Sequence, residues 1–130
     1  MSKDISIKKG LDIKLVGEAE QTTSSIPVKG VFALKPEDFH GIIPKLIAKE
    51  GAEVKAGESL FYSKSDERIL FSSPVSGKVT EIVRGAKRKI LTLKILADGK
   101  QEFKDFGKQD AGKMSAEEVK NHLFTSGCWP

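Results

Sequence analysis

The chain has 130 residues, of which 38% are hydrophobic and 31% are charged, and its formal net charge is +4. This composition is typical of a globular protein and excludes a largely disordered chain, while no apolar run approaches the ~18 residues that suggest a membrane-spanning helix. Cys128 is the single cysteine, which excludes internal disulfides and favours a reducing cytoplasm.

Residues 1–42 are expected to form short N-terminal strands and a loop that pack on the core. The charged first residues have no apolar stretch behind them, which argues against a secretory signal. Alternating apolar residues predict strands at 5–7, 11–15 and 28–34, with an irregular polar segment at 18–27. Pro36 then predicts a turn of helix, because proline suits the first helical position.

Residues 43–104 are expected to form the main domain, built from short strands separated by glycines. Apolar runs predict strands at 46–48, 60–62, 69–71, 79–83 and 90–96, and a turn at Asp98-Gly99 closes the last of them. Because these strands are short, closely spaced and nearly free of helical periodicity, we predict a mainly β fold, a small antiparallel barrel or sandwich.

Residues 105–130 are expected to form a linker and a short helix that lead to a missing next domain. Ser115 and Glu118 have the spacing of a capping box, and Gly127 suits the end of a helix. Trp129 stands beside the terminus with nothing after it to bury its ring, which indicates that the chain has been cut from a longer protein.

Basic residues are concentrated between positions 84 and 94, where no acidic residue occurs. They are Arg84, Lys87, Arg88, Lys89 and Lys94. Such a cluster could bind an acidic partner, an anionic membrane surface or nucleic acid, or it could be a solvated strand edge whose lysines discourage pairing with other edges. Nucleic acid is disfavoured, because no aromatic residues are interleaved with the charges.

Two glycine-containing sequence motifs flank a hairpin in the middle of the chain. Residues 51–60 read Gly-x-x-Val-x-x-Gly-Glu-x-Leu and residues 74–79 read Pro-x-x-Gly-x-Val, which resembles the biotinyl/lipoyl carrier and barrel-sandwich hybrid family. In carriers of that family a lysine occupies the tip of the hairpin. Here we expect Lys64 to lie too early, near the outgoing strand, with Asp66 and Glu67 at the carrier position. The resemblance therefore implies the fold without biotin or lipoate.

A narrower resemblance extends over almost the whole chain. It rests on residues 5–13, 17–21, Leu60-Phe61 with the hairpin that follows, 73–79, 84–88 and 125–129. These words, in this order, resemble the N-terminus of the A-subunit family of the sodium-translocating NADH:quinone oxidoreductase. The alternatives are the equivalent domain of the C-subunit of an ion-translocating ferredoxin:NAD oxidoreductase, or a non-catalytic biotinyl/lipoyl-like module.

The resemblance to the A-subunit family implies a peripheral protein on the cytoplasmic face of a bacterial inner membrane. Its complex carries electrons from NADH through flavins and an iron–sulfur centre to quinone, and exports sodium. The implied partners are the other subunits and a quinone, with no nucleic acid. This segment itself is expected to hold no catalytic, cofactor-binding or metal residue, because an iron–sulfur cluster needs several cysteines and a Gly-x-Gly-x-x-Gly loop for NADH is absent.

Three functional hypotheses follow from these features. In the first, the domain supports assembly and a basic patch of Arg84, Lys87, Arg88 and Lys89 docks a neighbouring subunit or lipid headgroups. In the second, the domain forms part of a quinone site, and in the third it is a free-standing carrier.

For the quinone hypothesis, His40 could relay protons, although an exposed loop histidine is the favoured interpretation, as it is for His122. Phe32, Phe61 and Phe71 could line the pocket, but strand phenylalanines more often fill a core.

Overall fold

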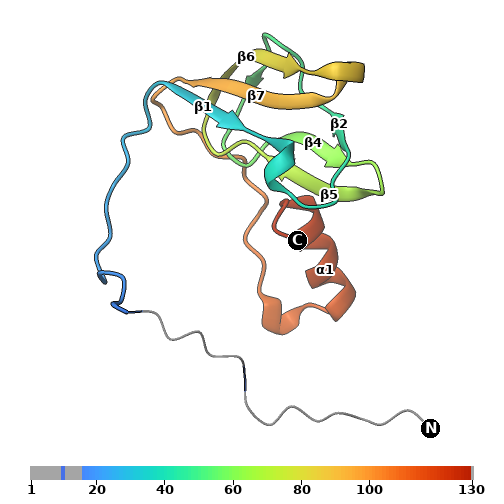
Figure 1. Cartoon of the computed structure of the whole chain (residues 1–130). Helices are drawn as coiled ribbons and strands as arrows, with labels where there is room; N and C mark the ends of the chain where they lie inside the picture. Colours follow the sequence, from blue (N-terminus) through green and yellow to red (C-terminus); the bar gives the residue numbers. More distant parts are fainter. Residues whose placement is uncertain (1–9, 11–15, 130) are drawn as a thin grey trace, which may run out of the picture.

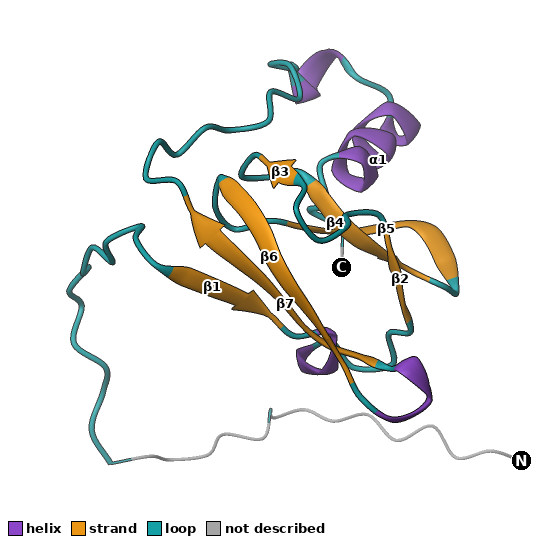
Figure 2. Ribbon diagram, turned by 90° about the horizontal axis from the view of Figure 1, so that it is seen from above, coloured by secondary structure: helices purple, strands orange, loops and turns teal. Residues whose placement is uncertain are grey.

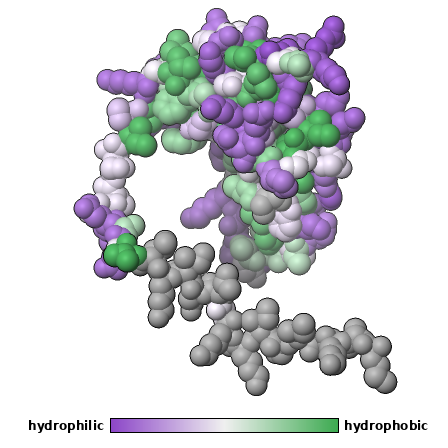
Figure 3. All heavy atoms as spheres, viewed as in Figure 1, coloured by the Kyte–Doolittle hydropathy of each residue, from purple (hydrophilic) through white to green (hydrophobic). Residues whose placement is uncertain are grey.

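The computed structural model describes residue 10 and residues 16–129, so the strands expected at 5–7 and 11–15 lie outside the described residues. Within the described ranges the fold is mainly β with a short C-terminal helix, as the sequence predicts (Figure 1). The polar segment expected to be irregular, residues 18–27, contains neither helix nor strand. Hydrophilic residues cover much of the visible face, with apolar groups between them (Figure 3).

Two antiparallel sheets form the body of the domain. The first has the strand order β1-β7-β6-β3, with bounds Val31–Leu34, Ile90–Ala97, Gly77–Arg84 and Glu53–Val54. The second has the order β2-β4-β5, with bounds Pro44–Leu46, Ser59–Ser63 and Asp66–Ser72. Figure 2 shows β1, β7 and β6 side by side in one layer and β4 and β5 in the other. This arrangement fits the predicted sandwich.

The hydrophobic core fills the space between the two sheets. Leu60 and Phe61 on β4 are fully buried, as are Val79 on β6 and Leu93 and Ile95 on β7. Burying an aliphatic or aromatic side chain of this size contributes roughly 1.5–3 kcal/mol, so this cluster is a main source of stability. The apolar run at 90–96 therefore located the strand β7 correctly.

The geometry at the start of β6 explains why the Pro-x-x-Gly-x-Val motif needs its glycine. Gly77 has φ +153°, and a Cβ at this position would collide with the backbone carbonyl oxygen of Leu96 on β7. A residue without a side chain is therefore required where the two strands approach. The backbone N–H of Gly57, in the other motif, donates to the carbonyl oxygen of Ser73 at 2.8 Å.

The second sheet differs from the prediction at β2. The strand occupies Pro44–Leu46 rather than 46–48. The backbone N–H groups of Ile47 and Ala48 both donate to the carbonyl oxygen of Leu60, at 2.9 and 3.0 Å, so the regular ladder ends before them. A propensity pattern locates the apolar residues but not the point at which pairing becomes irregular.

The hairpin between β4 and β5 also differs from the prediction. Ser63 pairs with Asp66, so Lys64 and Ser65 form the turn and Lys64 lies at the tip. The expectation that Lys64 lies too early was wrong, and Asp66 and Glu67 belong to the returning strand. A hydrogen bond of 2.7 Å joins the hydroxyls of Ser63 and Ser65 within the turn. The turn therefore lies at Lys64 and Ser65, before the position expected from the polar sequence.

The helices agree with their sequence signals. The 3-10 helix η1 covers Pro36–Asp38 and has proline in its first turn, and α1 covers Ala116–Thr125. Ser115 and Glu118 form the complete capping box, in which the Ser115 N–H donates to the Glu118 carboxylate at 2.8 Å. Gly127, with φ +69°, follows the helix as predicted.

The C-terminal segment packs against β5. Phe124 is buried on α1, and the guanidinium of Arg68 lies 4.7 Å above its ring. The ring of Trp129 lies 5.1 Å from the ring of Phe124 and stays 36% exposed. The preceding helix therefore supplies an aromatic contact, but Trp129 remains exposed, and the expectation that the chain has been cut from a longer protein stays a prediction. The division of the chain at residues 42/43 and 104/105 stays a prediction, although β1 shares a sheet with β3, β6 and β7.

Candidate functional site

The basic patch lies at the tip of the β6–β7 hairpin. Arg84 ends β6, Lys87 and Arg88 belong to the 3-10 helix η2 (Ala86–Arg88), and Lys89 precedes β7; all four are exposed. Lys87 and Arg88 have φ values of 52° and 60°. Hairpin turns with two positive φ angles prefer Asn and Gly, so this turn places two long cations where the backbone favours smaller residues.

The patch forms one side of a groove of about 510 Å³, which we call the basic groove. Its basic lining residues are Lys45, Lys64, Arg84, Lys87, Arg88 and Lys89, and the others are Ile43, Pro44, Leu46 and Ile90. Lys45 comes from β2 and Lys64 from the tip of the β4–β5 hairpin. Neither lysine is close to the patch in sequence, so only the pairing of the strands could reveal that they join it.

Few of the charges in the basic groove have an ionic partner. Lys89 donates to the Glu37 carboxylate at 2.6 Å, and this contact lowers the pKa of Glu37. Lys94, outside the groove, pairs with Glu81 at 2.7 Å. Within the described ranges, no ion pair involves the other basic residues of the groove, which are Lys45, Lys64, Arg84, Lys87 and Arg88. The groove therefore carries a locally unbalanced positive charge.

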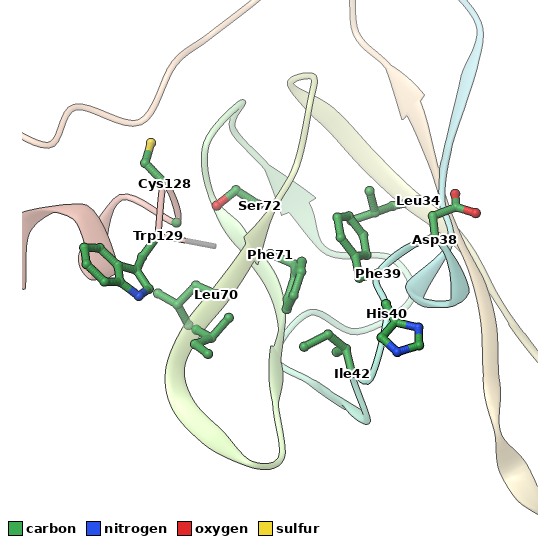
Figure 4. Close-up of a pocket in the computed structure, with 12 residues that line it drawn as sticks. Leu34, Asp38, Phe39, His40, Ile42, Leu70, Phe71, Ser72, Cys128 and Trp129 are labelled. Atoms are coloured by element: carbon green, nitrogen blue, oxygen red, sulfur yellow. The ribbon is translucent and has the colours of Figure 1, made fainter. Parts of the chain in front are cut away.

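A second hollow, the apolar pocket, has a volume of about 620 Å³ and lies beside β5, the end strand of its sheet. Phe39 and Phe71 face one another on one side of the strand, with ring centroids 4.6 Å apart (Figure 4). Leu70 and Trp129 lie on the other side. The remaining lining residues are Leu34, Asp38, His40, Ile42, Ile69, Ser72, Gly127 and Cys128.

Only some of the residues that the sequence suggested for a quinone pocket line the apolar pocket. His40 and Phe71 both line the apolar pocket, and His40 is exposed as a loop histidine should be. Phe61 is fully buried beneath Phe71, stacked at 4.6 Å, and Phe32 packs against the core. His122 lies on α1 and does not line the pocket. Phe39 and Trp129 were missed, because no periodic pattern connects a loop and a terminus to β5.

Ser72 adds a polar group to the wall of the apolar pocket. Its Oγ is buried, and no hydrogen-bond partner for it occurs in the part of the chain that the structure describes. A Cβ at Gly127 would lie 2.6 Å from this oxygen, so the C-terminal segment closes over it. An unpaired buried hydroxyl costs about 1–3 kcal/mol.

Metal and membrane signals are absent from the described residues. No group of three or more His, Cys, Asp or Glu side chains in residues 16–129 is arranged to hold a metal ion. No helix in the same part of the chain has both the length and the apolar character needed to cross a membrane. Cys128 is an exposed free thiol.

Comparison with known proteins places the fold in a family. A family model described as the NqrA N-terminal barrel-sandwich hybrid domain matches residues 5–98. The A-subunit of the Na(+)-translocating NADH-quinone reductase of Yersinia pseudotuberculosis is 36% identical over 127 residues. The corresponding proteins of Neisseria meningitidis and Tolumonas auensis are 38% identical over 127 and 128 residues.

These matches cover 96% of the chain but only 28–29% of each relative, so the chain spans less than a third of their length. They confirm the barrel-sandwich hybrid fold and the resemblance to the A-subunit family.

Proposed function

Since this chain belongs to the family of NqrA N-terminal barrel-sandwich hybrid domains, we propose that it is the N-terminal domain of the A-subunit of a bacterial sodium-translocating NADH:quinone oxidoreductase. In this role it is an assembly domain at the cytoplasmic face of the membrane. The flavins, the iron–sulfur centre and the NADH site belong to other parts of the complex, and the other subunits are its partners.

The basic groove is the observation that carries the assembly role. The patch of Arg84, Lys87, Arg88 and Lys89 projects from a hairpin tip, and Lys45 and Lys64 extend it across the groove. Exposed charges of one sign that are not balanced by neighbours raise the local potential and attract an oppositely charged surface. A domain with such a surface is suited to docking.

Reversing the charge of the patch tests this role. The triple variant R84E/K87E/R88E should leave the fold stable, because all three side chains are exposed, and should weaken the association of the full-length protein with its membrane complex. The control K29E/K100E/K108E changes the net charge equally at exposed positions outside the groove. Association is measured by co-purification with the membrane-embedded partners. Unchanged recovery of the triple variant would contradict the docking role.

Quinone contact is a second candidate function, supported by the apolar pocket. The pocket has the size of a small-ligand site, aromatic and aliphatic walls, and His40 as a polar group at its lining. In this proposal the ring of a quinone packs near Phe39 and Phe71, while His40 hydrogen-bonds one of its carbonyl oxygens.

Trp129 provides a direct assay for quinone contact, because it is the only tryptophan in the sequence and it lines the pocket. A short-chain benzoquinone should quench its fluorescence in a saturable way. Phe39→Ser should weaken this quenching, whereas Phe103→Ser, at a side chain that is 72% exposed outside the pocket, should not. Non-saturable quenching that is equal in both variants would exclude a site here.

A further inference from the structure

We infer that the basic groove binds the anionic phospholipid headgroups of a membrane surface, an inference that rests on the groove being a docking surface, as proposed above, and adds the membrane surface as its partner. The groove combines positive side chains from separate segments with exposed aliphatic side chains beside them. Phosphate groups at a bilayer surface are recognised by this combination, because the cations meet the headgroups and the aliphatic groups reach the acyl boundary.

The charges of the groove converge from three places in the fold. β2 contributes Lys45, the tip of the β4–β5 hairpin contributes Lys64, and the tip of the β6–β7 hairpin contributes the patch. Two hairpin tips and an edge strand therefore present cations to the same space. Among the lining residues, all of which are described, no acidic side chain occurs. Each lysine or arginine near an anionic leaflet adds to the attraction, so the contributions accumulate.

The aliphatic component comes from the segment around β2. Ile43, which lines the groove, is 62% exposed, and Ile47, just beyond its lining, is 48% exposed. Lys45 between them is exposed as well. Pro44 and Leu46, which alternate with them, are only partly exposed. The outward side of this segment therefore reads aliphatic, basic, aliphatic. Such a row suits the interface between headgroups and acyl chains, where lysine extends its charge to the phosphates.

The groove suits a membrane surface better than a nucleic acid, and it offers a protein partner no buried aromatic anchor. No aromatic side chain lines it, whereas single-stranded nucleic acids are bound by stacking on aromatic rings. Protein interfaces concentrate their binding energy in buried Trp, Tyr and Arg anchors. No Trp or Tyr lines the groove, and its Arg84 and Arg88 are exposed. A diffuse array of charges needs no single matching shape, which is what a lipid surface offers.

Vesicle binding by the 130-residue chain tests the inference. The chain should co-sediment with vesicles of phosphatidylcholine and phosphatidylglycerol and fail to co-sediment with phosphatidylcholine alone. Raising the ionic strength should release it, because salt screens exposed charges beyond a Debye length of about 10 Å at 0.1 M. Equal binding to both kinds of vesicle, or binding that is insensitive to salt, would overturn the inference.

Two variants locate the binding in the groove. K45E/K64E should weaken partition into phosphatidylglycerol vesicles by at least about tenfold, because two attractive charges become repulsive. The control K29E/K108E carries the same change outside the groove and should bind far better. I43S/I47S should lower the affinity at every salt concentration, because it removes the apolar contribution only. Equal loss in the control would assign the effect to net charge and would overturn the inference.

The outcomes for lipid binding and for assembly are separable. Suppose that R84E/K87E/R88E prevents assembly in detergent and that the wild-type chain does not bind anionic vesicles. The patch then docks a protein, so the lipid inference fails and the docking role stands. If the chain binds vesicles through the groove but the variant assembles normally, the lipid inference stands and the assembly role fails.

Discussion

Replacing Lys87 with Asn and Arg88 with Gly should stabilise the domain and weaken its binding to anionic surfaces. Both residues have positive φ angles, which cost an ordinary L-residue roughly 1–2 kcal/mol each. Asparagine tolerates this geometry and glycine adopts it freely. Glycine also lowers the free energy of unfolding by about 0.5–1 kcal/mol, because it has more conformational entropy to lose on folding. The net gain expected for K87N/R88G is therefore about 1–3 kcal/mol.

Urea unfolding followed by circular dichroism measures this gain. The transition midpoint should rise without a change in the slope m, because the surface exposed on unfolding stays the same. The melting temperature should rise by about 2–8 °C for each ~1 kcal/mol of stabilisation. As a control, Lys108→Gly at a residue without positive φ should lower the midpoint.

The same K87N/R88G variant should bind phosphatidylglycerol vesicles about tenfold less tightly, because it removes two cations from the basic groove. A variant that is less stable than the wild type, or one that is more stable but binds equally well, would refute the trade-off between backbone strain and charge at this turn.

Three further outcomes follow from single contacts. Gly77→Ala should destabilise the domain by about 3 kcal/mol in urea unfolding, because its Cβ would collide with the carbonyl of β7; an unchanged midpoint would contradict this close approach. Arg68 lowers the pKa of Asp66 to about 2, so the stabilisation by this carboxylate is present above its ordinary pKa near 4 and is lost as the pH falls towards 2. Asp66→Asn should therefore reduce stability at neutral pH, and the difference from wild type should shrink between pH ~4 and ~2; a pH-independent difference would argue against the pair. Glu37→Gln removes the partner of Lys89 and should strengthen vesicle binding a few-fold, because Lys89 is then free to meet the headgroups. Weaker binding would show that the lipids do not bind at Lys89.

The sequence predicted the parts of the fold that depend on local pattern. An apolar run located β7, and Ser115 with Glu118 identified the start of α1, because both signals involve neighbours in sequence. The position of Lys64 was mispredicted because the end of a hairpin depends on which residues pair across it, here Ser63 and Asp66.

The candidate sites were less accessible to sequence reasoning. A run of basic residues marks one hairpin tip, but Lys45 joins it only because β2 is the edge strand next to that hairpin in space. In the apolar pocket, Phe71 could be identified as an apolar strand residue, while its neighbours Phe39 and Trp129 come from a loop and from the segment after α1. Such contacts arise from tertiary packing, and no local period encodes them.

The pairing of β1 with β7 constrains the order in which the domain folds. Val31 on β1 pairs with Leu96 on β7. β1, which is synthesised first among the strands of this sheet, therefore cannot pair until β7 has been synthesised. The β4–β5 and β6–β7 hairpins close short loops and can form while β1 is still unpaired, since closing a long loop costs more entropy and proceeds more slowly. On the ribosome, β1 should therefore stay unprotected against hydrogen exchange until Ile90–Ala97 has emerged, and its docking should be the last step in completing the sheet.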